Sequence, residues 1–164
     1  HDANAWEGTD IEKFGAALPA AAVLSYTGEG MPLIYNGQEA GNPKRLAFFE
    51  KDPIVWRDHP MAKLYADLAR MRKANPALWN SEWGARMIKV PNSAPDAVLS
   101  FVRQNARNKV FTVINFSPKA QNVRFDEALH HGDYKEFFSG TQMRFPLAKE
   151  LSLPAWSYRI YTGK

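Results

Sequence analysis

The sequence contains no cysteine, so disulfide bonds, thiolate catalysis and cysteine-based zinc sites are excluded. It also lacks a long apolar run. Its most apolar stretch, residues 16–26, is rich in alanine and interrupted by Pro19. This stretch is well short of the ~20 residues that a bilayer-spanning helix needs. There is no low-complexity tract and no internal repeat. We therefore expect a globular chain without a membrane partner.

Charge of one sign is not concentrated anywhere in the chain. The net charge is +4 and the pI is near 9.3, but the basic residues are scattered. The densest group, Arg70, Arg72 and Lys73, lies in a helical pattern that also carries Asp67. A solvated helix face explains these charges better than a nucleic-acid surface does. We expect no nucleic-acid partner.

The chain also lacks an initiating methionine and a signal segment, since it opens His1-Asp2-Ala3-Asn4. We interpret this opening as the result of removal of an upstream part. The sequence carries no localisation signal, so our expectation of secretion or export to the periplasm is not encoded by any residue of the chain.

The first part of the chain has the pattern of an α/β protein. Apolar residues at helical spacing predict a helix over about 10–27, broken into two parts at Pro19 and ending near Gly28-Glu29-Gly30. The short apolar run Met31–Tyr35 then predicts a strand buried on both faces, as in a parallel sheet. Together they form the helix-then-strand half of a βαβ repeat.

A long loop and an amphipathic helix follow. Residues 37–60 show no periodicity, and loops of this length in compact domains are usually functional. Residues 61–75 have apolar positions at helical spacing. We expect Asp58 to cap this helix, Pro60 to lie in its first turn and Asn75-Pro76 to end it.

From Met87 onward the pattern changes to short strands separated by turns, which is typical of an antiparallel sandwich. The predicted strands are Val98–Arg103, Val110–Phe116, Val123–Phe125, Tyr134–Phe138 and Tyr158–Tyr161. The pair His130-His131 resembles a metal pair, but a solvated turn is the better interpretation. The boundary between the two parts lies near residue 80.

Several motifs occur in an order that resembles the alpha-amylase family of glycoside hydrolases. The chain begins His1-Asp2, and residues 30–39 read Gly-Met-Pro-Leu-Ile-Tyr-Asn-Gly-Gln-Glu. In that family, Asn-His-Asp ends the seventh barrel strand, and Gly-x-Pro-x-Ile-Tyr-Tyr-Gly-x-Glu forms the eighth strand and its loop. Asn36 departs from the second pattern, and the first is incomplete because nothing precedes His1.

The later parts of the chain continue the resemblance. Residues 44–46 and 52–56 resemble the loop before the family's last barrel helix. Residues 72–78, Arg-Lys-Ala-Asn-Pro-Ala-Leu, are similar to the end of that helix. Residues 101–103 and 113–117 resemble early strands of the C-terminal sandwich, and residues 153–158 its last strand.

The resemblance implies a fold and a division of the chain. It implies that residues 1–79 are the last helix-strand-helix units of a (β/α)8 barrel, an α/β fragment. Residues 80–164 would be an all-β antiparallel sandwich. It implies no cofactor in this chain, and calcium in the intact enzyme.

The resemblance also implies a chemistry and roles for particular residues. Retaining glycosidases use two carboxyl groups about 5 Å apart, one as nucleophile and one as general acid. The family adds a third carboxylate, here Asp2, which would bind sugar hydroxyls more tightly in the transition state. His1 would hold a hydroxyl of the same sugar. Arg45 would line the substrate cleft, although a surface salt bridge is an equal alternative.

The family's nucleophile and general acid lie on earlier strands that this sequence does not contain. The chain is therefore predicted to hydrolyse no alpha-1,4-glucan, starch or maltooligosaccharide, unless the missing N-terminal part of the enzyme is its partner. Transglycosylases share these motifs. Two other classes stay open: a non-catalytic carbohydrate-binding or accessory module, and a structural cap on the barrel.

Overall fold

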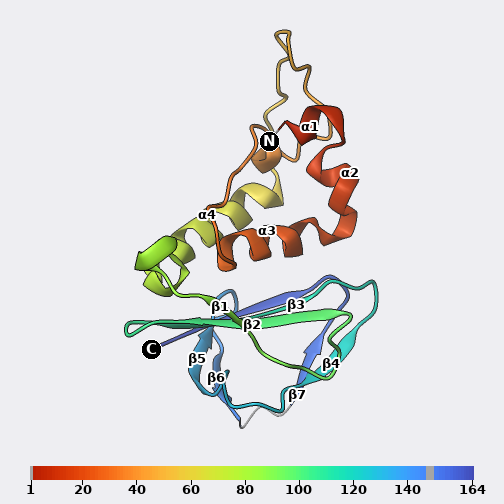
Figure 1. Ribbon diagram of the computed structural model, residues 1–164. Helices are drawn as coiled ribbons and strands as arrows, with labels where there is room; N and C mark the ends of the chain where they lie inside the picture. The colour runs from red at the N-terminus through yellow and green to blue at the C-terminus, as the bar shows by residue number, and fades with distance from the viewer. Residues whose placement is uncertain (1, 147–149) are drawn as a thin grey trace.

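The computed structural model describes residues 2–146 and 150–164. Figure 1 shows a layer of helices lying over a six-stranded sheet, with a second, two-stranded sheet on the far side. Among these residues no helix has the length and apolar character required to cross a bilayer.

The predicted two-part helix is confirmed. After the short α1 (Ala3–Trp6), α2 (Asp10–Phe14) runs into a 3-10 turn, Gly15–Ala17, and then into α3 (Leu18–Thr27). Pro19 lies in the first turn of α3, where its missing N–H leaves no bond unmade. Gly28 follows Thr27 and ends the helix.

The prediction of a buried strand over Met31–Tyr35 is wrong for this structure. The segment is extended, but no strand pairs with it among the described residues. Met31 is 82% exposed and Leu33 is 65% exposed. A strand of a parallel sheet is defined by the ladder bonds to its neighbours, and this part of the chain supplies none.

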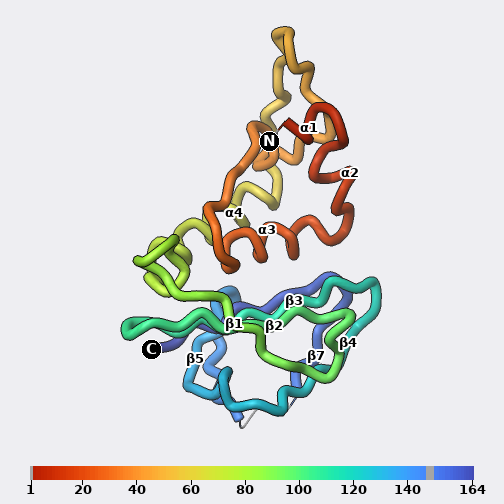
Figure 2. The backbone as a smooth tube through the Cα atoms, in the orientation of Figure 1, coloured from red at the N-terminus to blue at the C-terminus, as the bar shows by residue number. Residues whose placement is uncertain are grey.

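The predicted loop over residues 37–60 is confirmed, with one 3-10 turn at Gln38–Ala40. Figure 2 shows its central part extending away from the helices at the end of the molecule farthest from the sheets. Trp56 is 58% exposed because this loop lies away from both apolar cores.

The predicted amphipathic helix is α4 (Pro60–Ala74), which buries Met61, Tyr65, Leu68 and Met71. Its cap differs from the prediction. His59 rather than Asp58 occupies the N-cap, and its Nδ1 accepts the N–H of Met61 at 3.3 Å. Two 3-10 turns, Pro76–Leu78 and Ser81–Trp83, lead from α4 into the sheet.

The second half is antiparallel, as predicted. The larger sheet has the order β1-β2-β3-β8-β5-β6 and the smaller pairs β4 with β7. The strands are β1 (Met87–Lys89), β2 (Val98–Gln104), β3 (Lys109–Asn115), β4 (Gln121–Arg124), β5 (Gly132–Glu136), β6 (Gln142–Phe145), β7 (Glu150–Leu153) and β8 (Tyr158–Gly163). The strands β1, β6 and β7 lie outside the predicted runs because they are short and carry few apolar residues.

Strand β3 is buried on both faces, and this joins the layers. Val110 and Ile114 contribute to a core shared with α3 and α4. Phe111 and Val113 contribute to a second core between the two sheets. Successive side chains of a strand point to opposite faces, so one strand serves both cores.

Arg103 on β2 fastens the helical layer to the sheet. Arg103 is buried, with only 2% of the residue exposed. Its guanidinium donates to the carbonyl oxygens of Thr27, Gly28, Leu78, Trp79 and Ala85. The shortest of these bonds, from Nη1 to Gly28, measures 2.6 Å. Burial lowers the pKa of the Arg103 guanidinium, with the nearby Arg72 adding to the effect.

Replacing this guanidinium leaves several carbonyl oxygens without donors. We expect Arg103→Met to lower the free energy of unfolding by about 3 kcal/mol or more, because each buried unsatisfied group costs about 1–3 kcal/mol. Urea unfolding followed by circular dichroism measures this. The matched control is Arg107→Met, which removes the same charge from an exposed turn residue. Equal urea concentrations at the midpoint of unfolding for the two variants would show that Arg103 does not hold the layers together.

Candidate functional site

The candidate site residues lie at the end of the molecule that α1 and the long loop form. His1 lies outside the described residues. Asp2 is exposed and occupies the N-cap position of α1, where its backbone carbonyl accepts the N–H of Ala5 at 3.0 Å. Asp2 is therefore held at the start of a short helix and is accessible to solvent.

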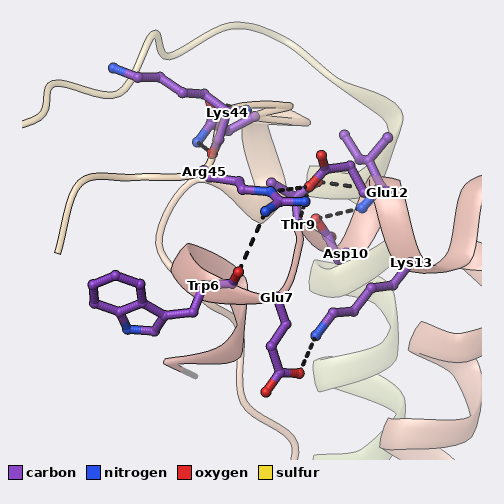
Figure 3. A network of polar contacts seen from close by, with 10 residues as sticks. Trp6, Glu7, Thr9, Asp10, Glu12, Lys13, Lys44 and Arg45 are labelled. Atoms are coloured by element: carbon purple, nitrogen blue, oxygen red, sulfur yellow. Dashed lines mark hydrogen bonds and ion pairs between the residues drawn. The ribbon is translucent and has the colours of Figure 1, made fainter.

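Arg45 comes from the long loop and contacts both helices at this end (Figure 3). Its Nε donates to Oε2 of Glu12 at 2.8 Å, and its Nη1 donates to the carbonyl oxygen of Trp6 at 3.4 Å. The structure thus shows the salt bridge that the sequence left as an alternative for Arg45. The Trp6 contact also brings the loop against α1, the helix that begins after Asp2.

Glu12 is the member of this network that the sequence analysis missed. It forms a capping box with Thr9: Glu12 Oε2 accepts the Thr9 N–H at 2.7 Å, and Thr9 Oγ1 accepts the Glu12 N–H at 3.1 Å. The order Thr-x-x-Glu at residues 9–12 is the signal that could have located it. The bonds from Arg45 and from the Thr9 N–H lower the pKa of Glu12. Because Oε2 of Glu12 already accepts from Thr9 and Arg45, we interpret Glu12 as a structural carboxylate.

Three aromatic rings lie beside this network. The centroids of Trp6 and Phe48 are 5.3 Å apart, and those of Phe48 and Phe49 are 4.9 Å apart. All three side chains are exposed, Phe49 by 85%. The turn that carries Phe48 and Phe49 is closed by Asp52, whose carboxylate accepts from Lys44 and from the Ala47 N–H. The ion pair with Lys44 lowers the pKa of Asp52.

Gln38 and Glu39 hold the shape of their own loop. Oε1 of Gln38 accepts the Tyr35 N–H at 2.9 Å, and Oε2 of Glu39 accepts the Gly37 N–H at 3.2 Å. Across the described residues, no three His, Asp or Glu side chains lie close enough together to hold a metal ion.

We expected the histidine pair to lie in a solvated turn, and this prediction is wrong for His130. His130 lies in a turn but is only 2% exposed. Its ring packs 5.2 Å from Phe111, 4.9 Å from Phe125 and 5.1 Å from Phe145, measured between centroids. Burial lowers its pKa to about 4, so at neutral pH the uncharged imidazole acts as a fourth aromatic ring of the core.

The family model described as Maltogenic Amylase, C-terminal domain, matches residues 88–160. The chain is similar to members of the alpha-amylase family over most of its length. Alpha-amylase 2 of Dictyoglomus thermophilum is 25% identical over 155 residues, which cover 85% of this chain and 25% of that protein. The branching enzyme GlgB of Prochlorococcus marinus is 29% identical over 142 residues, or 80% of this chain and 18% of that enzyme.

Solved structures confirm the fold of this amylase-related chain. The maltogenic alpha-amylase AmyB from Thermotoga neapolitana superposes with a TM-score of 0.75 at 18% identity, covering 90% of this chain and 36% of that one. A debranching enzyme from Nostoc punctiforme superposes with a TM-score of 0.68 at 22% identity, covering 94% and 30%. The chain thus spans a quarter or less of the two curated relatives named above and about a third of these structures.

The buried imidazole makes the stability of this chain depend on pH. The unfolded state takes up a proton near the ordinary histidine pKa, whereas folded His130 does so only at about 4. The unfolded state therefore binds more protons between these values, and stability falls as the pH is lowered through them. The loss is about 2–3 kcal/mol, since a pKa unit is worth about 1.4 kcal/mol and solvent screens part of it.

We expect His130→Phe to remove this part of the pH dependence. Free energies of unfolding in urea, measured at about pH 7 and about pH 4, give the difference. His131→Gln, which changes the half-buried neighbour, should retain most of the dependence of the unaltered chain, because burial lowers the pKa of His130 more than the charge of His131 does. If the free energy of unfolding of His130→Phe changes between the two pH values as much as that of the unaltered chain, this assignment is contradicted.

Proposed function

We propose that this chain is the C-terminal part of a retaining enzyme that acts on alpha-1,4-glucosidic bonds of starch or maltooligosaccharides. Relatives carrying the names alpha-amylase and alpha-glucan branching enzyme support this proposal. So does the order of motifs from His1-Asp2 to residues 153–158, which agrees with that family along the whole chain.

The segment Met31–Tyr35 is the observation that carries the proposal. It is apolar, it follows the turn that ends α3, and Met31, Leu33 and Ile34 are exposed without a pairing strand among the described residues. Such a segment is costly in isolation and suits a strand with neighbours on both sides. We assign residues 1–79 to the end of a (β/α)8 barrel and residues 80–164 to a sandwich that supports it.

In this assignment Asp2 is the carboxylate that stabilises the transition state, and His1 binds a hydroxyl of the same sugar. Both would lie at the carboxyl end of a barrel strand, where barrel enzymes build their sites. Arg45, fixed against Trp6 and Glu12, would line the cleft beside them. The nucleophile and the general acid come from upstream strands, and the chain by itself supplies neither.

The test compares the chain with the longer enzyme that it would complete. We expect the chain alone to release no reducing sugar from soluble starch. In the longer enzyme, Asp2→Asn should lower kcat roughly 10²–10³-fold, as loss of one group that stabilises a transition state does. Asp96→Asn, at an exposed residue of a turn in the sandwich, is the matched control and should leave kcat unchanged.

Two results would count against the proposal. One is hydrolysis of starch by the purified chain alone, because it would place a nucleophile and an acid within these residues. The other is full activity of the Asp2→Asn enzyme.

A further inference from the structure

An open groove of about 1030 Å³ lies far from Asp2, between the edge of the larger sheet and the start of α3. Strands β5, β6 and β8 and the turn before β8 form its walls, and Ala16 and Pro19 close its helical side. Figure 1 shows the sheets at the opposite end of the molecule from α1 and the long loop. The groove is therefore separate from the residues considered so far.

One wall of the groove is aromatic. The rings of Phe138 and Tyr158 lie 5.5 Å apart at an interplanar angle of 60°, and Phe138 is 41% exposed. Trp156 joins them from the turn before β8, where its backbone has a φ of 56° and its N–H donates to the Ser117 carbonyl at 3.1 Å. A left-handed conformation is unfavourable for a bulky residue and persists only where the surrounding structure enforces it.

The polar part of the groove contains a carboxylate with unused bonding capacity. Glu136 is only 6% exposed. Its Oε2 accepts the Ser139 N–H at 2.7 Å, whereas its buried Oε1 has no hydrogen-bond partner among the described residues. A buried acceptor without a donor is costly, and a hydroxyl that enters the groove can supply the donor.

The charges of the lining favour a neutral ligand. Glu136 is opposed by Arg159, whose Nη1 donates to the Tyr158 carbonyl at 2.8 Å. With one charge of each sign, the groove lacks the excess positive charge that a polyanion needs. Aromatic faces beside hydrogen-bonding groups suit a molecule that carries C–H faces and hydroxyl groups in the same ring. The volume lies at the upper end of the range for small-molecule sites, which suits several linked rings.

We propose that this groove binds an alpha-glucan chain, with the sugar rings against Phe138 and Trp156 and a hydroxyl donated to Glu136. The groove itself selects a neutral, hydroxyl-rich ligand, and the choice of an alpha-glucan rests on the proposed function.

Isothermal titration of the full chain with maltoheptaose tests this inference. We expect Phe138→Ala and Glu136→Gln each to raise the dissociation constant about tenfold, because each variant loses one well-placed contact. The matched controls are Phe49→Ala, an exposed ring at the other end of the molecule, and Glu82→Gln, an exposed carboxylate outside the groove. Both controls should bind as the unaltered chain does.

Thermal unfolding of each variant keeps the comparison valid. Phe138 is partly exposed, so its alanine variant should fold, and it carries the test if Glu136→Gln does not. Absence of maltoheptaose binding by the unaltered chain overturns the inference. A loss in Phe49→Ala that equals the loss in Phe138→Ala also overturns it, since the ligand would then lie at the aromatic tip. The hydrolysis test on the longer enzyme does not involve the groove, so the two proposals can fail separately.

Discussion

The arrangement of the two layers depends on the buried guanidinium of Arg103. It lies where the end of α3, the turn after α4 and the strand β2 meet, and it binds backbone carbonyls of the first two together with that of Ala85. Carbonyls at the end of a helix are orphan acceptors with a partial negative charge, which a cation compensates well. A rigid fork of five donors can serve several of them at once, as the single ammonium of lysine could not.

Arg72 on α4 makes similar hydrogen bonds to the end of α3 and to the residues that follow it. It donates to the carbonyls of Tyr26 and Gly30 and to the side chain of Asn80. The two arginines together bind the carbonyl oxygens at the end of α3 and just after it.

The proposed functions lie in different parts of the molecule and use different chemistry. At the end formed by α1 and the loop, the exposed Glu12 and the half-buried Asp52 are already ion-paired, which fixes the shape of the loop. In the groove at the sheet edge, Glu136 is buried and keeps one oxygen unpaired. Exposed ion pairs contribute little to affinity, whereas a buried acceptor can contribute much when a ligand satisfies it.

The sequence by itself determined the elements whose signals are local. The break at Pro19, the helix over 61–75 and the main antiparallel strands follow from steric rules and from periodicity over a few residues. The ordered motifs likewise indicated the relationship to alpha-amylases. Only the tertiary structure decided the contacts between distant segments: Arg45 with Glu12, His130 among phenylalanines, Arg103 beneath α3 and the groove around Glu136. Within residues 2–146 and 150–164 it also gave Met31–Tyr35 no pairing strand, because an apolar run specifies a preference for burial but cannot supply the neighbours that bury it.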